Sequence, residues 1–507
     1  MDRRLFLRRF AGTTAVAPDA YPPLQPPSVA AGLEPYTGPW TARQAAHLIR
    51  RTHFGLSRAD LGQALASTPG QIVDLYVDTA RARTLPGAPS WYNQTTSNGS
   101  TNIEWIYEWQ HSWYAEMRAG GLREKMALLW HDHFSTQYPV YEHAAFAYQY
   151  LTFLREHSLG NFRDLLEGIG QQPAMLRFLN GVDNWYDNST NTPHYNENYA
   201  RELLELFSLG ILGPDGSPNY SQADIVEAAK ALTGWVVDEN PPRGRYDPSR
   251  HDNGNKTIFG QTGNWGYDDV IDIIFQQRES EMAHFVAGKL YSWFVYPAPN
   301  TQVVADLAQV LLGNSFDIAE AVRVLLKSAH FYEEAFIGAR IKFPSELLVG
   351  FTREMEIIPT QASLERFRVD GFLLGQDVFN PPSVAGWPGF SPDQYRAWIT
   401  TGTLPSRRGF SRRFIEGSSD QDPIDARQLV ENYSDPTSAE AIVSDFTAHF
   451  LANPLPQETV DELLDVLLNG APVYEWYTLY QTTPSTAEAR LKDFFIALCD
   501  LPEFQLT

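Results

Sequence analysis

The sequence predicts an all-α, mainly α-helical protein: a multi-helix globular bundle with long irregular loops and little or no sheet. Apolar residues recur at helical spacing through most of the chain after residue 40, and Ser or Thr caps precede many of these stretches. No window shows sustained alternation of apolar and polar residues, which is the pattern of a half-buried strand. Both observations favour helices over sheets.

The first half of this unit contains eight predicted helices before its most charged stretch. Thr41, Ser57 and the pair Thr68-Pro69 are suitable N-terminal residues for the first three helices. The predicted helices cover residues 42–51, 58–66, 69–79, 104–118, 122–134, 141–156, 161–171 and 173–179. A polar loop at 181–195 leads into a further helix at 196–207, which Gly210 ends.

The second half continues the same pattern. Ser221 caps a helix at 222–233, and two segments rich in Gly and Pro, 234–266 and 377–392, are predicted to be irregular. The remaining predicted helices cover residues 267–277, 279–294, 301–312, 318–331, 343–357, 363–374, 425–431, 437–451, 458–468 and 486–499. Because long loops inside a folded domain are usually functional, the segment 234–266 is a candidate for part of a site.

Composition excludes several classes of protein. The 507 residues carry a formal net charge of −22, whereas nucleic-acid and anionic-membrane partners require a basic surface. A single cysteine, Cys499, excludes an intrachain disulfide and a thiolate metal cluster. Outside the N-terminus no stretch approaches the 18 apolar residues of a membrane span, so we expect a soluble mature protein.

The N-terminus resembles a twin-arginine export signal. Arg3-Arg4 precede a short apolar segment, and we interpret residues 1–17 as a degenerate signal of this type. Seven prolines in residues 18–39 indicate a linker. Residues 40–507 then form one large helical unit, and a division into two subdomains near 335–375 is compatible with the pattern. The predicted location is periplasmic or secreted, or cytoplasmic if the signal does not function.

The helix at 196–207 is the strongest candidate for a site. Its apolar residues fall on one side at 100° per residue, and the opposite side carries Glu197, Asn198, Arg201, Glu202 and Glu205. The spacing of Arg201 from Glu197 and Glu205 suits helical ion pairs. Two hypotheses account for this pattern. One is a solvated helix face, and the other is a carboxylate cluster that performs chemistry or holds a ligand.

Histidines provide the other candidate groups. His131 and His133 point about 200° apart in a continuous helix, so they can bind one metal ion only if the helix ends there. A structural role for either histidine is the competing hypothesis. His251 and Asp252 lie with Lys256 in the loop 234–266, where they either serve a site or hold a hairpin together.

Several motifs together resemble the DUF1800 family of bacterial proteins, from about residue 40 to near the end of the chain. They are His47–Arg51 with Phe54-Gly55, Arg123–Met126 through Trp130–Phe134, Leu159–Leu165, Asn196–Leu203, Ala231–Trp235, His251-Asp252 with Lys256, and Pro381-Pro382 with Gly386–Pro388. The family has no defined reaction. The resemblance implies export, and it implies a neighbouring sulfatase-like protein of the DUF1501 family as a partner. Here a longer Asn-rich loop replaces the short Gly-Pro turn that usually precedes Asn196.

Two functional hypotheses follow. The first is a hydrolase of a polysaccharide or other envelope polymer, in which paired carboxylates act as acid and base. Its predicted catalytic residues are Glu197, Arg201, Glu202, Glu205, His131, His251 and Asp252. One divalent metal on His131, His133 and Glu202 is compatible with this set. The predicted substrate-binding residues are Asn196, Asn198, Lys256, Trp235 and Trp387, in which the tryptophans stack on sugars. The second hypothesis is a non-catalytic envelope protein that binds a DUF1501 partner and uses the Glu/Arg cluster structurally.

Overall fold

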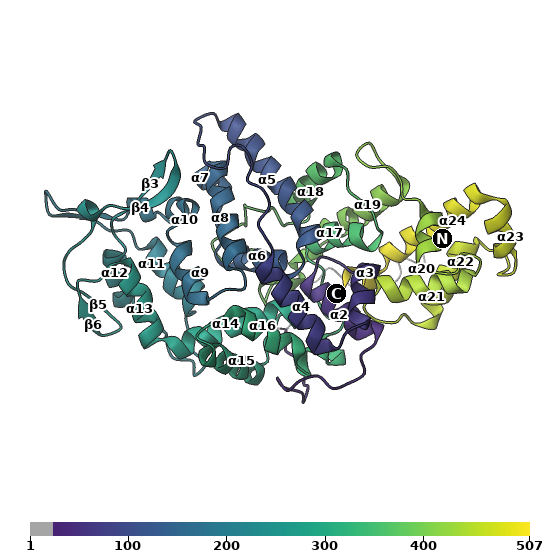
Figure 1. The fold of residues 1–507 in the computed structure, drawn as a ribbon, viewed down its shortest axis with the longest axis horizontal. Coiled ribbons are helices and arrows are strands. Elements are labelled where there is room, and N and C mark those ends of the chain that lie inside the picture. Colours follow the sequence, from purple (N-terminus) through teal and green to yellow (C-terminus); the bar gives the residue numbers. More distant parts are fainter. Residues whose placement is uncertain (1–23) are drawn as a thin grey trace.

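Helix α6 (Leu122–His133) runs through the centre of the molecule in the computed structural model, which describes residues 24–507 (Figure 1). Every residue of this helix is buried, including its charged ones. Helices surround α6 on all sides, and the only sheets among the described residues are three two-stranded hairpins. The predicted mainly α-helical fold is therefore confirmed.

Most helices before the charged stretch agree closely with the prediction, but α5 is longer than expected at both ends and the short helix α7 was not predicted. Their bounds are α2 (Ala42–Thr52), α3 (Arg58–Leu65), α4 (Pro69–Ala82), α5 (Gly99–Gly120), α7 (Tyr138–Tyr141), α8 (Ala144–His157), α9 (Phe162–Ile169) and α10 (Pro173–Phe178). Thr41 and Ser57 accept backbone hydrogen bonds as N-caps, and Thr68 forms a capping box with Gln71.

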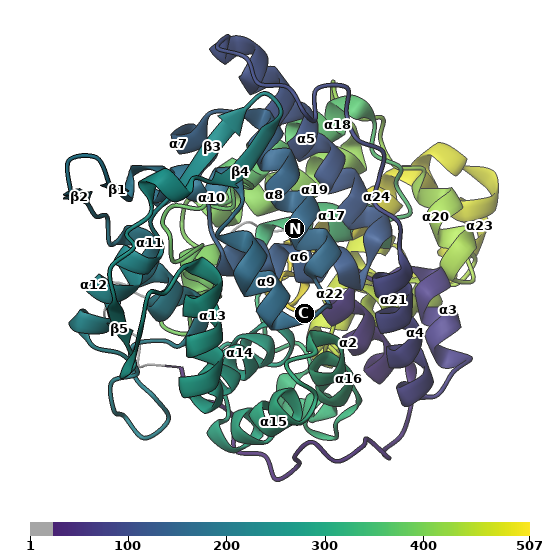
Figure 2. The same cartoon turned by 60° about the vertical axis from the view of Figure 1, so that its left-hand side comes forward.

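The later helices extend the molecule along its long axis. They are α11 (Asn198–Glu202), α12 (Gln222–Ala231), α13 (Tyr267–Gln277), α14 (Glu279–Phe294), α15 (Thr301–Gly313), α16 (Ile318–Lys327), α17 (Pro344–Glu354), α18 (Gln361–Leu373), α19 (Thr403–Glu416), α20 (Ala426–Tyr433), α21 (Ala439–Phe450), α22 (Gln457–Leu468), α23 (Glu475–Thr482) and α24 (Pro484–Asp500). Figures 1 and 2 place α11–α13 with the hairpins at one end and α20–α24 at the other.

Two of these helices were not predicted from the sequence. Pro405 and Gly409 lie within α19 and weaken its helical signal, yet Phe410 and Phe414 are buried on one face of it. Helix α23 has only eight residues, of which Trp476 and Tyr480 are buried. In both cases tertiary packing of an aromatic face stabilises a helix that propensity alone leaves marginal.

The segments expected to be irregular contain the hairpins. Strands β3 (Trp235–Glu239) and β4 (Pro242–Tyr246), and then β5 (Lys256–Ile258) and β6 (Gln261–Gly263), pair antiparallel within the predicted loop 234–266. Strands β1 (Trp185–Asp187) and β2 (Thr192–His194) pair just before the charged helix. Strands of three to five residues are too short to show alternation, so the expectation of irregular structure was wrong there.

The described part of the proline-rich segment is docked on the protein. Residues 24–39 form no helix, as expected, but Pro35 makes a β-bridge with Ser328. The ring of Tyr36 lies 4.5 Å from that of Tyr332, between ring centroids. This stretch therefore packs against the segment after α16. The expected signal, residues 1–17, lies outside the described residues.

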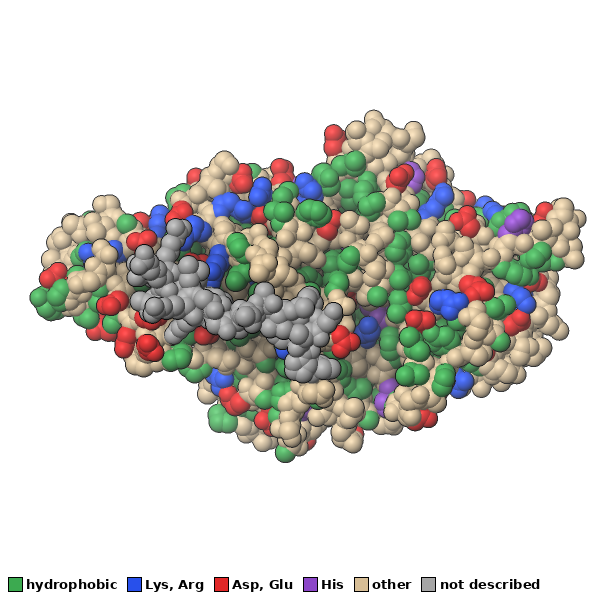
Figure 3. All heavy atoms as spheres, turned by 180° about the vertical axis from the view of Figure 1, so that it is seen from behind, with side chains coloured by type: hydrophobic (Ala, Val, Ile, Leu, Met, Phe, Trp, Pro, Cys, Tyr) green, Lys and Arg blue, Asp and Glu red, His purple; other side chains and the backbone are tan. Residues whose placement is uncertain are grey.

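The surface agrees with the composition. On the face in Figure 3, acidic, basic and apolar side chains are interspersed, and no single basic patch covers it. Among residues 24–507 no helix is both long and apolar enough to cross a membrane.

Candidate functional site

The charged stretch, residues 196–207, begins as an α-helix, as predicted, and continues as a π-helix. Asn196 accepts a hydrogen bond from the N–H of Asn198 at 3.0 Å, which orders the start of α11. After Glu202 the chain continues as the π-helical segment η3 (Leu203–Ser208), in which the N–H of Leu209 bonds the carbonyl of Leu204 at 3.1 Å. Such π-turns insert one residue into a helix and are frequent at functional sites.

The inserted residue changes which side chains are buried. Leu204 is fully buried, whereas Leu206, which a regular helix would place on the apolar side, is half-buried. Glu205 remains on the polar side with Glu202, and both are half-buried. A regular 100° pattern could not reveal this change because it assumes a continuous α-helix.

Glu197 and Arg201 form a surface ion pair. Arg201 Nη2 lies 3.0 Å from Glu197 Oε2, and the two side chains are 39% and 38% exposed. The side chain of Gln222, at the start of α12, bonds both of them. A pair this exposed contributes about 0.3–0.5 kcal/mol to stability, so it is a modest connection between α11 and α12.

Glu202 and Glu205 differ in their hydrogen bonding. Glu205 accepts a hydrogen bond from Tyr220 Oη at 2.7 Å. Within residues 24–507 no hydrogen bond or ion pair reaches the carboxyl group of Glu202. Burial raises the pKa of Glu202 and the neighbouring Glu205 raises it further, although Arg201 opposes this. The two adjacent carboxyl groups thus have different environments: Glu205 accepts a hydrogen bond, and Glu202 is the group whose ionisation burial disfavours.

His131 is part of the core. Its Nε2 accepts the N–H of Phe379 at 2.9 Å, so Nδ1 carries the proton and lies 2.9 Å from Tyr150 Oη. Tyr150 in turn donates to the carbonyl of Phe134 at 2.8 Å. Burial lowers the pKa of His131 to about 3, so the ring is neutral. Both ring nitrogens are occupied by protein groups.

His133 is also buried and touches the charged stretch at its far end. Its Nε2 donates to the carbonyl of Phe207 at 3.0 Å, and its Nδ1 has no partner among the described residues. Burial lowers the pKa of His133 to about 3, and the nearby Lys289 contributes. His133 therefore contacts the charged stretch, residues 196–207, at Phe207, and no bond joins it to Glu202 in the described residues.

A metal site on these residues does not form in the described structure. Residues 24–507 contain no group of three or more His, Cys, Asp and Glu side chains arranged to hold a metal ion. His131 also lacks a free ring nitrogen. The expectation of a metal on His131, His133 and Glu202 is therefore not supported by the geometry.

Asp132 is a buried acid that the sequence analysis did not select. Its Oδ1 accepts the N–H of Trp387 at 2.8 Å, and Gly386 approaches so closely that a Cβ there would lie 2.1 Å from Oδ1. Burial raises the pKa of Asp132 to about 7, and Lys289 opposes this. Trp387 itself is 2% exposed and packs edge-on against His131, so it is closed to an external sugar in this structure.

His251, Asp252 and Lys256 do come together, as a hydrogen-bonded unit. Lys256 is 1% exposed and donates to the carbonyl of Asp252, to Asn264 Oδ1 at 3.1 Å and to His251 Nε2 at 3.4 Å. His251 Nδ1 lies 3.1 Å from the carbonyl of Thr233. These bonds use all three ammonium hydrogens and both ring nitrogens. The unit holds the hairpin β5–β6 in place.

The unit formed by His251, Asp252 and Lys256 is hydrogen-bonded to the residue that precedes the charged stretch. Tyr195 Oη donates to Asp252 Oδ2 at 2.5 Å, directly before Asn196. Trp235 is half-buried and packs between Tyr246 and Tyr267. Segments that the sequence analysis treated separately are therefore neighbours, although no bond joins His251 to Glu202 in the part of the chain that is described.

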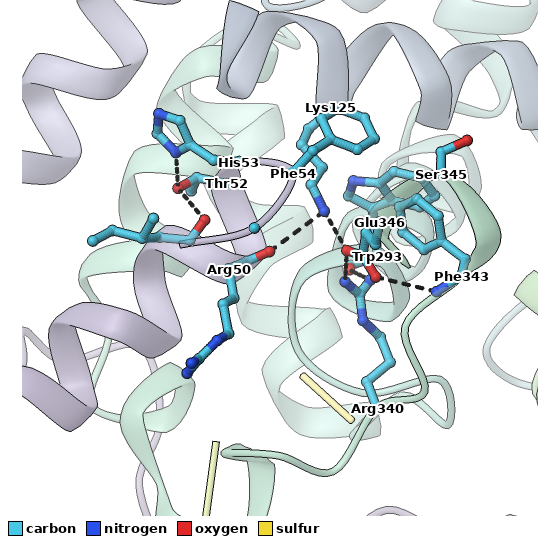
Figure 4. Close-up of polar contacts among 12 residues, drawn as sticks. Arg50, Thr52, His53, Phe54, Lys125, Trp293, Arg340, Phe343, Ser345 and Glu346 are labelled. Atoms are coloured by element: carbon cyan, nitrogen blue, oxygen red, sulfur yellow. Dashed lines mark hydrogen bonds and ion pairs between the residues drawn. The ribbon is translucent and has the colours of Figure 1, made fainter. Parts of the chain in front are cut away.

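A buried ion network lies at the centre of the molecule and was also not selected from the sequence (Figure 4). Glu346 on α17 accepts hydrogen bonds from Lys125 on α6 and from Arg340. Although burial alone would raise the pKa of Glu346, Arg340 and Lys125 hold it below its ordinary value. Burial lowers the pKa of Lys125 to about 7.

The network extends to α2 and to the C-terminal helices. Glu354 lies 4.0 Å from Arg50 and 3.7 Å from Lys342, between side-chain nitrogen and oxygen atoms. Arg407 on α19 is fully buried and bonds the side chain of Gln505 at 2.6 Å. Two of the motifs quoted above, 47–51 and 123–126, thus provide cations to one buried cluster. Charged residues inside apolar helical stretches were the available sequence signal.

Comparison with protein families gives one match. Residues 47–506 match the model described as "Protein of unknown function (DUF1800)". Comparison with curated proteins and comparison with solved structures each give no match.

Proposed function

Because the chain belongs to the DUF1800 family, whose description assigns no reaction, we propose from the geometry that it is a hydrolase of a polysaccharide or other envelope polymer. Glu202 is the general acid and Glu205 is the base or nucleophile. The resemblance to exported proteins supports a periplasmic or secreted location. Neither a metal ion nor the buried histidines take part in this proposal.

The unpartnered carboxyl group of Glu202 carries the proposal. The buried carboxylate of Glu346 has two cationic partners, whereas no ion pair or hydrogen bond within residues 24–507 reaches the carboxyl group of Glu202. A half-buried acid with a raised pKa next to a second carboxylate is typical of a catalytic pair.

The chemistry follows from the two environments. A protonated Glu202 donates its proton to the leaving-group oxygen as the bond to the polymer breaks. The carboxylate of Glu205 accepts a hydrogen bond from Tyr220. It either deprotonates a water molecule that attacks the substrate, or attacks the substrate itself and forms an ester that water then hydrolyses.

The proposal is tested by hydrolysis of a panel of polysaccharides and purified peptidoglycan, measured as released reducing ends. We expect Glu202→Gln to reduce turnover on any cleaved polymer by at least about 100-fold, since loss of a general acid typically costs that much. Glu279→Gln, which changes an exposed glutamate at the start of α14, should retain wild-type turnover. Wild-type turnover by Glu202→Gln would exclude the proposed acid.

A non-catalytic role as a partner of a DUF1501 protein is the second candidate. One observation favours it: the motifs at 47–51 and 123–126 contribute to the buried network and not to a cleft. Co-expression with the neighbouring DUF1501 protein tests this directly. A stable stoichiometric complex that forms equally well with the Glu202→Gln variant would favour this role over the hydrolase.

A further inference from the structure

The buried ion network has more positive than negative side chains. Its cations are Arg50, Arg51, Lys125, Arg340, Lys342 and Arg407, each at most 6% exposed, and its carboxylates are Glu346 and Glu354. Isolated charges are costly in the protein interior unless opposite charges compensate them. Among the described side chains of this cluster, six cations thus share two carboxylates.

Several hydrogen-bond donors of the cluster also lack an acceptor. Nε and Nη1 of Arg51, Nε of Arg340 and Nη1 of Arg407 are buried and have no acceptor among residues 24–507. The other nitrogens of these groups are bonded: Arg51 Nη2 to the carbonyl of Phe336 at 2.9 Å, and Arg340 Nη1 to that of Trp293 at 2.7 Å. Buried donors are almost always paired, so each of these unpaired guanidinium donors has room for a further acceptor, and Arg340 is the one of the three arginines that lines a cavity.

A small cavity adjoins the cluster at Arg340. It is lined by Arg340, Phe343, Ser292, Phe390, Tyr395 and Trp398, among others, and has a volume of about 20 Å³. About 10–15 Å³ of such volume accommodates one water molecule. The space therefore admits one water molecule or a monatomic ion.

We propose that this cavity binds a halide ion, with chloride as the natural ligand, against the guanidinium group of Arg340. Water would satisfy the free donor Nε of Arg340, whereas an anion would also oppose the positive charges of Arg340, Lys125 and Arg51, which share the single carboxylate of Glu346. An anion provides both an acceptor and a negative charge. The positive charges of Arg51 and Arg340 repel each other, and Glu346 attracts both. An anion beside Arg340 would reduce this repulsion.

The position of the cavity gives the ion a structural role. Arg340 precedes α17, Ser292 lies in α14, and Phe390 belongs to the segment η7 (Pro388–Phe390). A halide there would hold these three parts of the chain around the centre of the molecule. The proposal is independent of the hydrolase, because the cavity is not lined by Glu202 or Glu205.

Bromide diffraction provides the direct test. Crystals of the full chain grown in bromide should show an anomalous peak in contact with Arg340. Bromide peaks confined to the outer surface, or none at all, would overturn the proposal.

A cavity-filling variant provides the solution test. Ser292→Leu should fill the cavity while leaving all charges of the cluster in place, and Ser280→Leu, at an exposed position on the same helix, is the matched control. At constant ionic strength, replacing sodium gluconate by sodium chloride should raise the melting temperature of the wild type and of Ser280→Leu by several degrees. Ser292→Leu should lose this response. An equal chloride response in all three proteins would contradict the proposal, and if Ser292→Leu does not fold, the bromide experiment decides.

Discussion

The imidazole Nε2 of His133 lies 3.0 Å from the carbonyl oxygen of Phe207 and joins the central helix α6 to the π-helical segment η3. The carbonyl groups at the end of a helix lack partners within it, so a side-chain donor here satisfies one of them. The contact therefore fixes the segment that carries Glu205 against the core. The bond thus joins the motif that ends at Phe134 to the chain four residues after the motif that ends at Leu203.

Replacing His133 tests this connection. We expect His133→Leu to lower the free energy of unfolding by about 1–3 kcal/mol, because a buried carbonyl loses its donor. The matched control is His284→Leu on α14, where Nδ1 bonds only the carbonyl of Ser280 in the same helix. Urea unfolding measures both variants. Equal losses of stability would show that the bond to Phe207 has no special importance.

Glu202 and Glu346 should respond in opposite ways to the same substitution. Glu346→Gln removes the partner of Lys125 and Arg340, and breaking a buried ion pair in this way typically costs about 3–5 kcal/mol. Glu202→Gln replaces a carboxyl group that has no hydrogen-bond or ion-pair partner in the described chain and whose ionisation burial disfavours, so stability at pH 7 should be unchanged or slightly higher. Thermal and urea unfolding of the two variants are the measurements. A large loss of stability in Glu202→Gln would instead indicate a structural role.

Helix positions were predictable because spacing and caps are local signals. The boundaries of α2, α12 and α14 follow from Thr41, from Ser221 and from apolar periodicity, and the structure agrees within about two residues. The hairpins β3–β4 and β5–β6 were missed because their strands are too short to show alternation, and the turn Phe259-Gly260 also lacks the usual hairpin sequence.

The candidate site was predictable only in part. Sequence spacing correctly identified the polar face with Glu202, and it grouped His251 with Lys256, but it could not show that Lys256 would be 1% exposed. Burial of a charged group depends on which distant segments pack over it. For the same reason the network of Lys125 and Glu346, 221 positions apart in the chain, was not predictable from spacing.

Buried neutral histidines should make the protein sensitive to acid. Burial lowers the pKa values of His131, His133 and His449 to about 3, well below the value of about 6.5 in an unfolded chain. Between these values the unfolded state binds more protons than the folded state. The contribution of these histidines to the free energy of unfolding is therefore fully present above pH 6.5 and is lost as the pH falls. Each histidine contributes a slope of about 1.4 kcal/mol per pH unit in that range.

His449 is the most suitable of the three for a test. Its ring packs against Tyr433 and Phe450, and its Nε2 has no partner among the described residues, so His449→Phe should retain most of the packing. Urea unfolding at pH 7.0, 6.0 and 5.5 should show a smaller pH dependence for His449→Phe than for the wild type. An unchanged slope would mean that His449 titrates normally in the folded protein.

Asp132 should have the opposite pH dependence, because its pKa is raised to about 7 in the folded protein. Between about pH 4, the ordinary value for this group, and pH 7 the folded state binds more protons, so its contribution to stability is full at low pH and is lost as the pH rises. Asp132→Asn keeps an acceptor for the N–H of Trp387 and removes the charge. We expect this variant to be more stable than the wild type at pH 8 by up to about 4 kcal/mol, and to lose that advantage at pH 4. Urea unfolding at the two pH values measures the difference. A gain in stability that is the same at both would show that the carboxyl group does not titrate in this range, and that the asparagine acts through packing.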